Sequence, residues 1–162
     1  MKKIVLSVLV ENSSGVLSRV AGLFSRRGYN IDSLTVGITQ NPAFSRMTIV
    51  CSGEDEILEQ IRKQVAKLVD VVDITELPES ESVCRELVLV KVGIDQEERQ
   101  QVIAIADIFR AKIVDVSEKS VIVELTGNQT KLEAFLRLLG NFKVMQVART
   151  GITGLARGSF EA

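Results

Sequence analysis

The segment from Glu11 to Leu17 is the part of the chain best suited to bind a small polar ligand. It follows an apolar run typical of a buried strand and precedes a helical pattern, which predicts a strand-to-helix turn. The first backbone N–H groups of a helix have no partner within the helix and lie at the positive end of its dipole, so they suit a carboxylate. The carbonyl oxygen of Asn12 could accept a hydrogen bond from an ammonium group, and Gly15 would let a ligand approach the backbone closely.

The same turn also has a purely structural interpretation, in which Ser13 or Ser14 caps the helix and Gly15 only turns the chain. A second group of polar residues, formed by Asp95, Glu97 and Glu98, could suggest a metal or acid/base site. Acidic residues at the start of a helix complement its dipole, however, and we interpret this group as structural.

Catalysis by this chain alone is not expected. The 162 residues include no histidine, which removes the commonest general base and metal ligand. Cys51 and Cys84 fit no metal-ligand spacing and are interpreted as reduced structural thiols. Gly151, Gly154 and Gly158 lack the spacing of a dinucleotide-binding fingerprint. No metal or cofactor is therefore expected on this chain.

Charge and hydropathy exclude several classes of partner. The net charge is -1, so no broad basic surface is available for nucleic acid or for an anionic membrane. No apolar run approaches the ~20 residues that cross a bilayer, and the N-terminal residues do not form a secretory signal. These features predict a cytoplasmic protein without membrane or nucleic-acid partners.

The pattern of apolar residues predicts two successive βαββαβ units. The first has a strand at 4–10, a helix at 16–27, a hairpin of strands 34–38 and 47–51, a helix at 54–68 and a strand at 69–77. A polar stretch at 78–84 predicts a linker. In the second unit, strands at 87–92, 113–116, 121–125 and 144–148 alternate with a helix at 96–110 and another whose capping box is Thr130 and Glu133.

This order predicts the α+β class, with two tandem ferredoxin-like domains whose antiparallel sheets carry helices on one face. The domains are expected to span 1–77 and 85–162, the second including the glycine-rich tail. Val5 and Leu9 would lie on the sheet face opposite the helices, so a second copy or a second domain is expected to cover them.

Several motifs closely resemble the small subunit of acetolactate synthase, and they extend over essentially the whole chain. They include LSVLVEN at 6–12, GVLSRV at 15–20, LFSRRGYNI at 23–31, SLTV at 33–36, SRMTI at 45–49, LVDV at 68–71, IFRAKIVDV at 108–116, VARTGI at 147–152 and GLARG at 154–158. The first half resembles the ACT domain of that family, a ferredoxin-like sensor of amino acids.

The resemblance implies a regulatory subunit that is not itself an enzyme. It would activate a separate catalytic large subunit, which carries the thiamine diphosphate, Mg²⁺ and FAD, and would confer feedback inhibition by a branched-chain amino acid, most often valine. The effector would bind between two ACT domains of a homodimer or larger assembly. The site would comprise Asn12, Ser13, Ser14, Gly15, Val16 and Leu17 of one subunit, with Asn30 and Ile31 of its neighbour.

Two other functions compete with this one. A free-standing ACT sensor could control another enzyme or a regulator, and binding to a large subunit would distinguish the two. A ferredoxin-like sheet could also bind RNA, but that function needs stacking aromatic residues and a basic face, and this chain has one Tyr, six Phe and no Trp.

Overall fold

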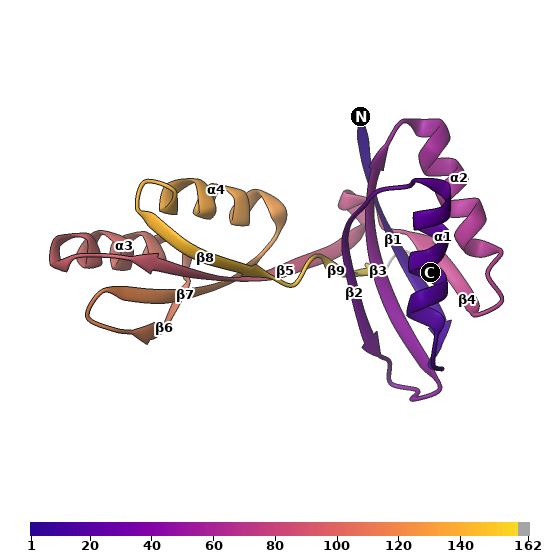
Figure 1. Ribbon diagram of the computed structural model, residues 1–162, viewed down its shortest axis with the longest axis horizontal. Coiled ribbons are helices and arrows are strands. Elements are labelled where there is room, and N and C mark those ends of the chain that lie inside the picture. The colour runs from indigo at the N-terminus through magenta and orange to yellow at the C-terminus, as the bar shows by residue number, and fades with distance from the viewer. Residues whose placement is uncertain (159–162) are drawn as a thin grey trace. The chain divides into compact units, whose positions relative to one another are not determined.

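The structure, a computed structural model, describes residues 1–158, and the chain divides into two compact units. The first unit comprises Met1–Cys84 together with residues 152–158 of the tail, and the second comprises Arg85–Gly151. In each unit two helices lie on one face of an antiparallel sheet (Figure 1). The predicted α+β class and the two ferredoxin-like βαββαβ patterns are confirmed.

The first unit has its strands in the order β2-β3-β1-β4, which places β2 and β4 at the two edges of the sheet. Its elements are β1 (Lys2–Glu11), α1 (Val16–Arg27), β2 (Ile31–Ile38), β3 (Phe44–Gly53), α2 (Asp55–Ala66) and β4 (Val71–Glu76). A short 3₁₀ turn, η1 (Glu79–Glu81), follows β4.

The second unit repeats this order, with strands arranged β6-β7-β5-β8. Its elements are β5 (Ser82–Gly93), α3 (Gln96–Phe109), β6 (Lys112–Val116), β7 (Ser120–Gly127), α4 (Gln129–Leu139) and β8 (Lys143–Arg149). A final short strand, β9 (Thr153–Ala156), pairs with β5.

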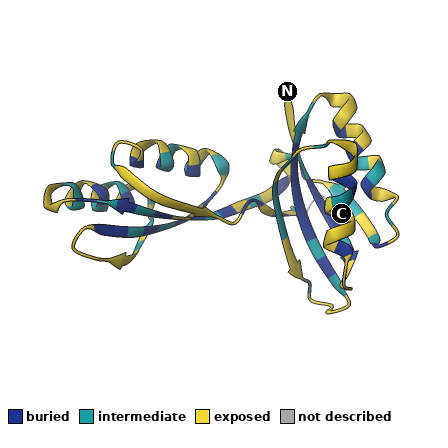
Figure 2. Cartoon of the chain, viewed as in Figure 1, coloured by how far each residue is buried: buried dark blue, intermediate teal, exposed yellow. Residues whose placement is uncertain are grey.

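Both cores form between the helices and the sheet, as the alternation of apolar residues requires. Leu6, Val8 and Val10 of β1 are at most 1% exposed and pack with the apolar stripe of α1, which includes Val20 and Phe24. In Figure 2 the buried residues of each helix lie on the side that faces the sheet, and the opposite side is exposed. This packing fixes the rotation of α1 and therefore the position of its first turn.

The ends of α1 follow the glycine positions in the sequence. The helix stops at Gly28, whose φ of 69° lies in the left-handed region, and the N–H of Tyr29 donates to the carbonyl of Phe24. Arg26 and Arg27 lie in the last turn, where positive charge complements the helix dipole.

The start of α4 differs from the prediction. The sequence predicted a capping box of Thr130 and Glu133, whereas the N-cap is Asn128, whose side chain accepts from the N–H of Lys131. Asn is at least as good an N-cap as Thr, so the helix begins one residue before Thr130.

The glycine-rich tail, which the sequence analysis assigns to the second domain, belongs by its contacts to the first compact unit over residues 152–158. The carbonyl of Ile152 accepts from Thr35 Oγ1 at 3.3 Å, and the N–H of Arg157 donates to the carbonyl of Glu81 at 2.9 Å. β9 also lies against β3.

The tail covers part of the sheet face opposite the helices. Thr35, Thr48 and Ser7 form one row across that face, because Thr35 pairs with Thr48 and Thr48 with Ser7. Thr48 and Ser7 are 1% and 3% exposed, and Ile152, which bonds to Thr35, is 8% exposed. The sequence predicted a second copy or a second domain over this face, whereas the chain's own tail provides some of the cover.

Candidate functional site

The first turn of α1 is open to a ligand. Its N-cap is Gly15, whose φ of 86° lies in the left-handed region, and no side chain caps the helix. Neither Ser13 nor Ser14 acts as the cap, so the structural interpretation of these two serines is not supported. The N–H groups of the first turn are left without a side-chain acceptor and face an exposed turn.

The other three α-helices of residues 1–158 begin differently. The side chain of Asp95 caps α3 in a capping box with Glu98, which agrees with the structural interpretation of that acidic group. Asn128 caps α4, and α2, which like α1 has no side-chain cap, carries Asp55 and Glu56 in its first turn. In contrast, the first turn of α1 contains no acidic residue. No residue in the first turn of α1 therefore compensates the positive end of the helix dipole.

Arg19 is a residue of this region that the sequence did not single out. Its Nε donates to Asp70 Oδ2 at 2.5 Å and its Nη2 to Asp70 Oδ1 at 3.0 Å, a two-pronged ion pair. These hydrogen bonds lower the pKa of Asp70, although burial acts in the opposite direction. A helical side chain leans toward the N-terminus, so a residue four positions after Gly15 reaches back over the first turn. That spacing is the signal that could have identified Arg19.

Asn12 is held in place beside the turn. Its Nδ2 donates to the carbonyl of Pro42 at 3.0 Å, and its Oδ1 accepts from Ser45 Oγ at 3.2 Å. A carbonyl oxygen has two acceptor positions, so Oδ1 retains one for an ammonium group. The backbone N–H of Asn12 also donates to the carbonyl of Ala43, which joins the turn to the start of β3.

Val16 and Leu17 differ in what they can offer. Val16 is 3% exposed and packs in the core, so only its backbone N–H is available to a ligand. Leu17 is 48% exposed and its side chain faces outward. An exposed leucine beside a free helix N-terminus suits a ligand that combines a carboxylate with an apolar side chain.

Asn30 and Ile31 belong to a different part of the first unit. Asn30 Nδ2 donates to Asp32 Oδ1 at 2.7 Å, and Asp32 in turn accepts from Ser52 Oγ. Ile31 packs against the core cluster and pairs with Cys51. Both lie at the start of β2, away from the first turn.

Strand register shows how far apart the two groups lie. Ile31 pairs with Cys51, which pairs with Ile4, whereas Glu11 at the other end of β1 pairs with Phe44. The seven steps from Ile4 to Glu11 correspond to about 23 Å along a strand. Within one chain, Asn30 and Gly15 therefore cannot contact the same small ligand.

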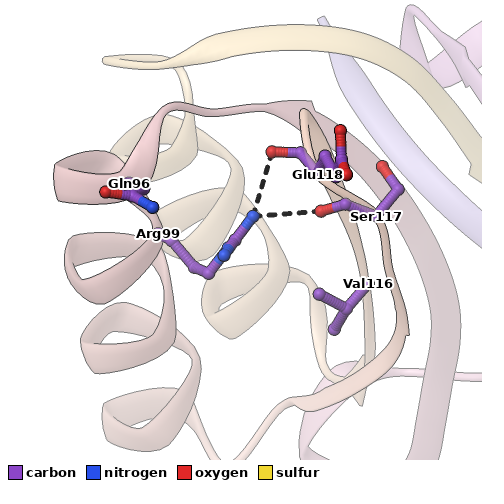
Figure 3. Close-up of a pocket in the computed structure, with 5 residues that line it drawn as sticks. All are labelled: Gln96, Arg99, Val116, Ser117 and Glu118. Carbon is purple, nitrogen blue, oxygen red and sulfur yellow. Dashed lines mark hydrogen bonds between the residues drawn. The ribbon is translucent and has the colours of Figure 1, made fainter.

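A hollow of ≈ 640 Å³ lies in the second unit, far from these residues in sequence. It is lined by Gln96, Arg99, Val116, Ser117 and Glu118. Figure 3 shows the Arg99 side chain reaching from α3, with Nη2 donating to the carbonyls of Ser117 and Glu118, both at 3.0 Å. Arg99 thus ties α3 to the turn between β6 and β7, and none of the predicted site residues lies there.

No group of three or more Asp, Glu, Cys or His residues within residues 1–158 is arranged to hold a metal ion. Neither Cys51 nor Cys84 forms a disulfide bond. Burial raises the pKa of the Cys51 thiol to about 12, so this thiol stays protonated at neutral pH.

None of the helices in the described part of the chain is both long enough and apolar enough to cross a membrane.

Comparison with known proteins first defines the class of the two units. Residues 6–73 match the family model described as the AHAS small subunit-like ACT domain. Residues 85–158 match the family model described as the small subunit of acetolactate synthase. The first unit is therefore an ACT domain.

Similar proteins match over nearly the whole chain. The acetolactate synthase small subunit of Mycobacterium bovis is 54% identical over 153 residues, which cover 94% of this chain and 91% of that protein. The isozyme 3 small subunit of Salmonella typhimurium is 50% identical over 155 residues, 95% of each chain. The crystal structure of the small subunit from Thermotoga maritima superposes with a TM-score of 0.88 at 44% identity, covering 97% of this chain and 98% of that one. The chain belongs to the acetolactate synthase small subunit family.

Proposed function

We propose that this chain activates the catalytic large subunit of acetolactate synthase and makes it sensitive to feedback inhibition by valine. The chain would have no active site of its own, and the thiamine diphosphate, Mg²⁺ and FAD of the reaction would belong to the large subunit. The observation that carries the effector site is the uncapped N-terminus of α1 at Gly15, within an ACT domain. A free amino acid offers the carboxylate that this end of the helix lacks.

The effector would be held by groups of opposite character at its two ends. The free N–H groups of Val16 and Leu17 would bind the carboxylate, while Asn12 would accept from the ammonium group. Leu17 is exposed beside them and would contact a branched aliphatic side chain. These residues occupy one side of an exposed turn, and a second surface is needed to enclose the ligand.

A second copy of the chain would provide that surface. β2 is an edge strand, and Val36 and Ile38 on it are 48% and 67% exposed. Antiparallel pairing of β2 with β2 of another copy would place the start of one strand beside the end of the other. Asn30 would then lie at the sheet end that carries Gly15 of the partner, which is the end opposite to its own Gly15. The proposed assembly is therefore a homodimer or a larger assembly built from it.

A mixed dimer tests this arrangement. One subunit carries Gly15→Asp, which places a carboxylate where the effector's carboxylate would lie, and the other carries Asn30→Ala. If the site is shared between subunits, both changes damage the same site and about half of the high-affinity valine sites remain by titration calorimetry. Loss of all high-affinity sites, or an Asn30→Ala homodimer that binds valine as tightly as the wild type, would refute the shared site. Homodimers of each variant are the controls for folding.

Reconstitution tests the role of the chain as a whole. Adding it to a purified large subunit should raise acetolactate synthesis, and valine should then lower the rate. The chain alone should show no synthesis. A chain that binds valine but neither binds nor activates the large subunit would instead be a free-standing sensor.

A further inference from the structure

The guanidinium of Arg19 presents one nitrogen to the open end of α1. Nε and Nη2 are both used by the carboxylate of Asp70, at 2.5 and 3.0 Å. Nη1 lies over Gly15, at 2.8 Å from the position that a Cβ on this glycine would occupy. The absence of a side chain at Gly15 is what allows this close approach.

The ion pair is built so that Asp70 is fixed and Arg19 faces outward. The side chain of Asp70 is 7% exposed, whereas that of Arg19 is 48% exposed. The N–H of Glu11 also donates to the backbone carbonyl of Asp70, which joins this residue to the end of β1. Asp70 is therefore a rigid support, and the two-pronged contact sets the plane of the guanidinium.

The groups that meet at this point are hydrogen-bond donors. They comprise the free N–H groups of the first turn of α1 and the two N–H bonds of Arg19 Nη1, and no acidic residue lies in that turn. Both oxygens of the one carboxylate that contacts Arg19 are already engaged with Nε and Nη2. A ligand that matches these donors is an anion with two acceptor oxygens, such as a carboxylate.

We propose that Arg19 binds the carboxylate of the amino-acid effector through Nη1, and that Asp70 is a positioning residue that holds Arg19 in place. This inference rests on the proposed function, and it adds a positively charged side chain to a site otherwise made of backbone N–H groups and Asn12. It also gives Gly15 a second role, since any side chain at this position would displace Nη1.

Titration calorimetry with the full chain tests the proposal by comparing valine with valinamide, in which a neutral amide replaces the carboxylate. The wild-type chain should prefer valine by about ten- to a hundredfold, the range expected for a hydrogen bond to a charged group. Arg19→Gln should lower valine affinity by a similar factor while leaving valinamide affinity unchanged. The preference for valine should then shrink, and the part that remains would come from the backbone N–H groups of the first turn.

Arg149→Gln is the matched control. Arg149 pairs with Glu86 in the second unit, and the exposures of the two side chains are 39% and 4%, close to those of Arg19 and Asp70. This variant also loses an arginine from a half-exposed ion pair, but it should keep the full preference for valine. If Arg19→Gln does not fold, Arg19→Lys tests the role of Nη1 instead. Lysine keeps the positive charge beside Asp70 but has no second nitrogen that could lie over Gly15.

Each result has one meaning. An undiminished preference for valine in both Arg19 variants would show that Arg19 serves only the fold, and the inference would be wrong while the proposed function stands. Failure of the wild-type chain to bind valine, together with a valine-insensitive reconstituted enzyme, would overturn both. A preference that falls in the Arg19 variants but not in Arg149→Gln supports the inference.

Discussion

Replacing Gly154 with alanine should release the tail from the first unit. A Cβ at this position would lie 2.6 Å from Cys84 Sγ, 3.0 Å from the carbonyl oxygen of Val83 and 3.2 Å from Leu77 Cδ1. Either these neighbours move, at a cost of about 1–3 kcal/mol for overpacking, or the tail leaves. In the second case Ile152, which is 8% exposed, loses burial of its side chain worth about 1.5–3 kcal/mol.

Gly158→Ala is the control for this change, because a Cβ at Gly158 would meet nothing within 4 Å. Both substitutions reduce the freedom of the unfolded chain, and this effect alone stabilises by about 0.4–1 kcal/mol. Because this effect is common to both variants, their free energies of unfolding should differ only by the cost of overpacking or of lost burial, about 1–3 kcal/mol. Urea titrations followed by circular dichroism measure this difference, and trypsin cleavage after Arg157 should become faster in Gly154→Ala alone. Equal stability and equal cleavage in the two variants would refute the packing of the tail described above.

Two further predictions concern the second unit. Glu86 is 5% exposed and accepts from Gln129, Arg149 and the N–H of Gly151, so Glu86→Gln should lower the free energy of unfolding by about 1–3 kcal/mol. Burial raises the pKa of Glu86, but the hydrogen bonds lower it by more, so the pKa in the folded chain lies below that in the unfolded chain. The stabilisation is therefore fully present above the unfolded-chain pKa of about 4.3 and is lost as the pH falls through the folded-chain pKa. Urea titrations from pH 7 to pH 3 should show the gap between wild type and variant closing in acid, and a constant gap would contradict the assignment. In the same assay Asn128→Ala should lower the free energy of unfolding by about 1 kcal/mol, whereas Thr130→Ala should lower it far less. The reverse order would show that Thr130 is the N-cap, as the sequence predicted.

The periodicity of the sequence was sufficient for both folds because each strand and helix has an apolar pattern of its own. The prediction of α1 agrees with the structure at both ends, since Gly15 and Gly28 flank the apolar stripe. β2 and β3 extend beyond the predicted limits because most of the added residues are polar or glycine and break the apolar alternation, although they pair with a neighbouring strand.

The pairing of the tail and the Arg19–Asp70 ion pair were not predicted from the sequence for a different reason. β9 is only four residues long, and its partner strand β5 lies about 70 residues earlier, so no local sequence pattern predicts the pairing. Asp70 is likewise 51 residues from Arg19, and nothing in either segment specifies the ion pair. Long-range polar contacts depend on the assembled fold, whereas the apolar patterns that build the fold are local.

The position of the tail limits how a second copy can approach the ACT domain. One face of its sheet is covered by α1 and α2, and the other is partly covered by residues 152–156 (Figure 1). Face-to-face stacking of two sheets would require the tail to leave, with the loss of Ile152 burial estimated above. The exposed edge at β2, with Val36 and Ile38, requires no such rearrangement and offers free backbone groups for pairing. Asn30 immediately precedes this edge strand, so the approach that the tail permits is also the one that would bring Asn30 to the sheet end that carries the partner's Gly15.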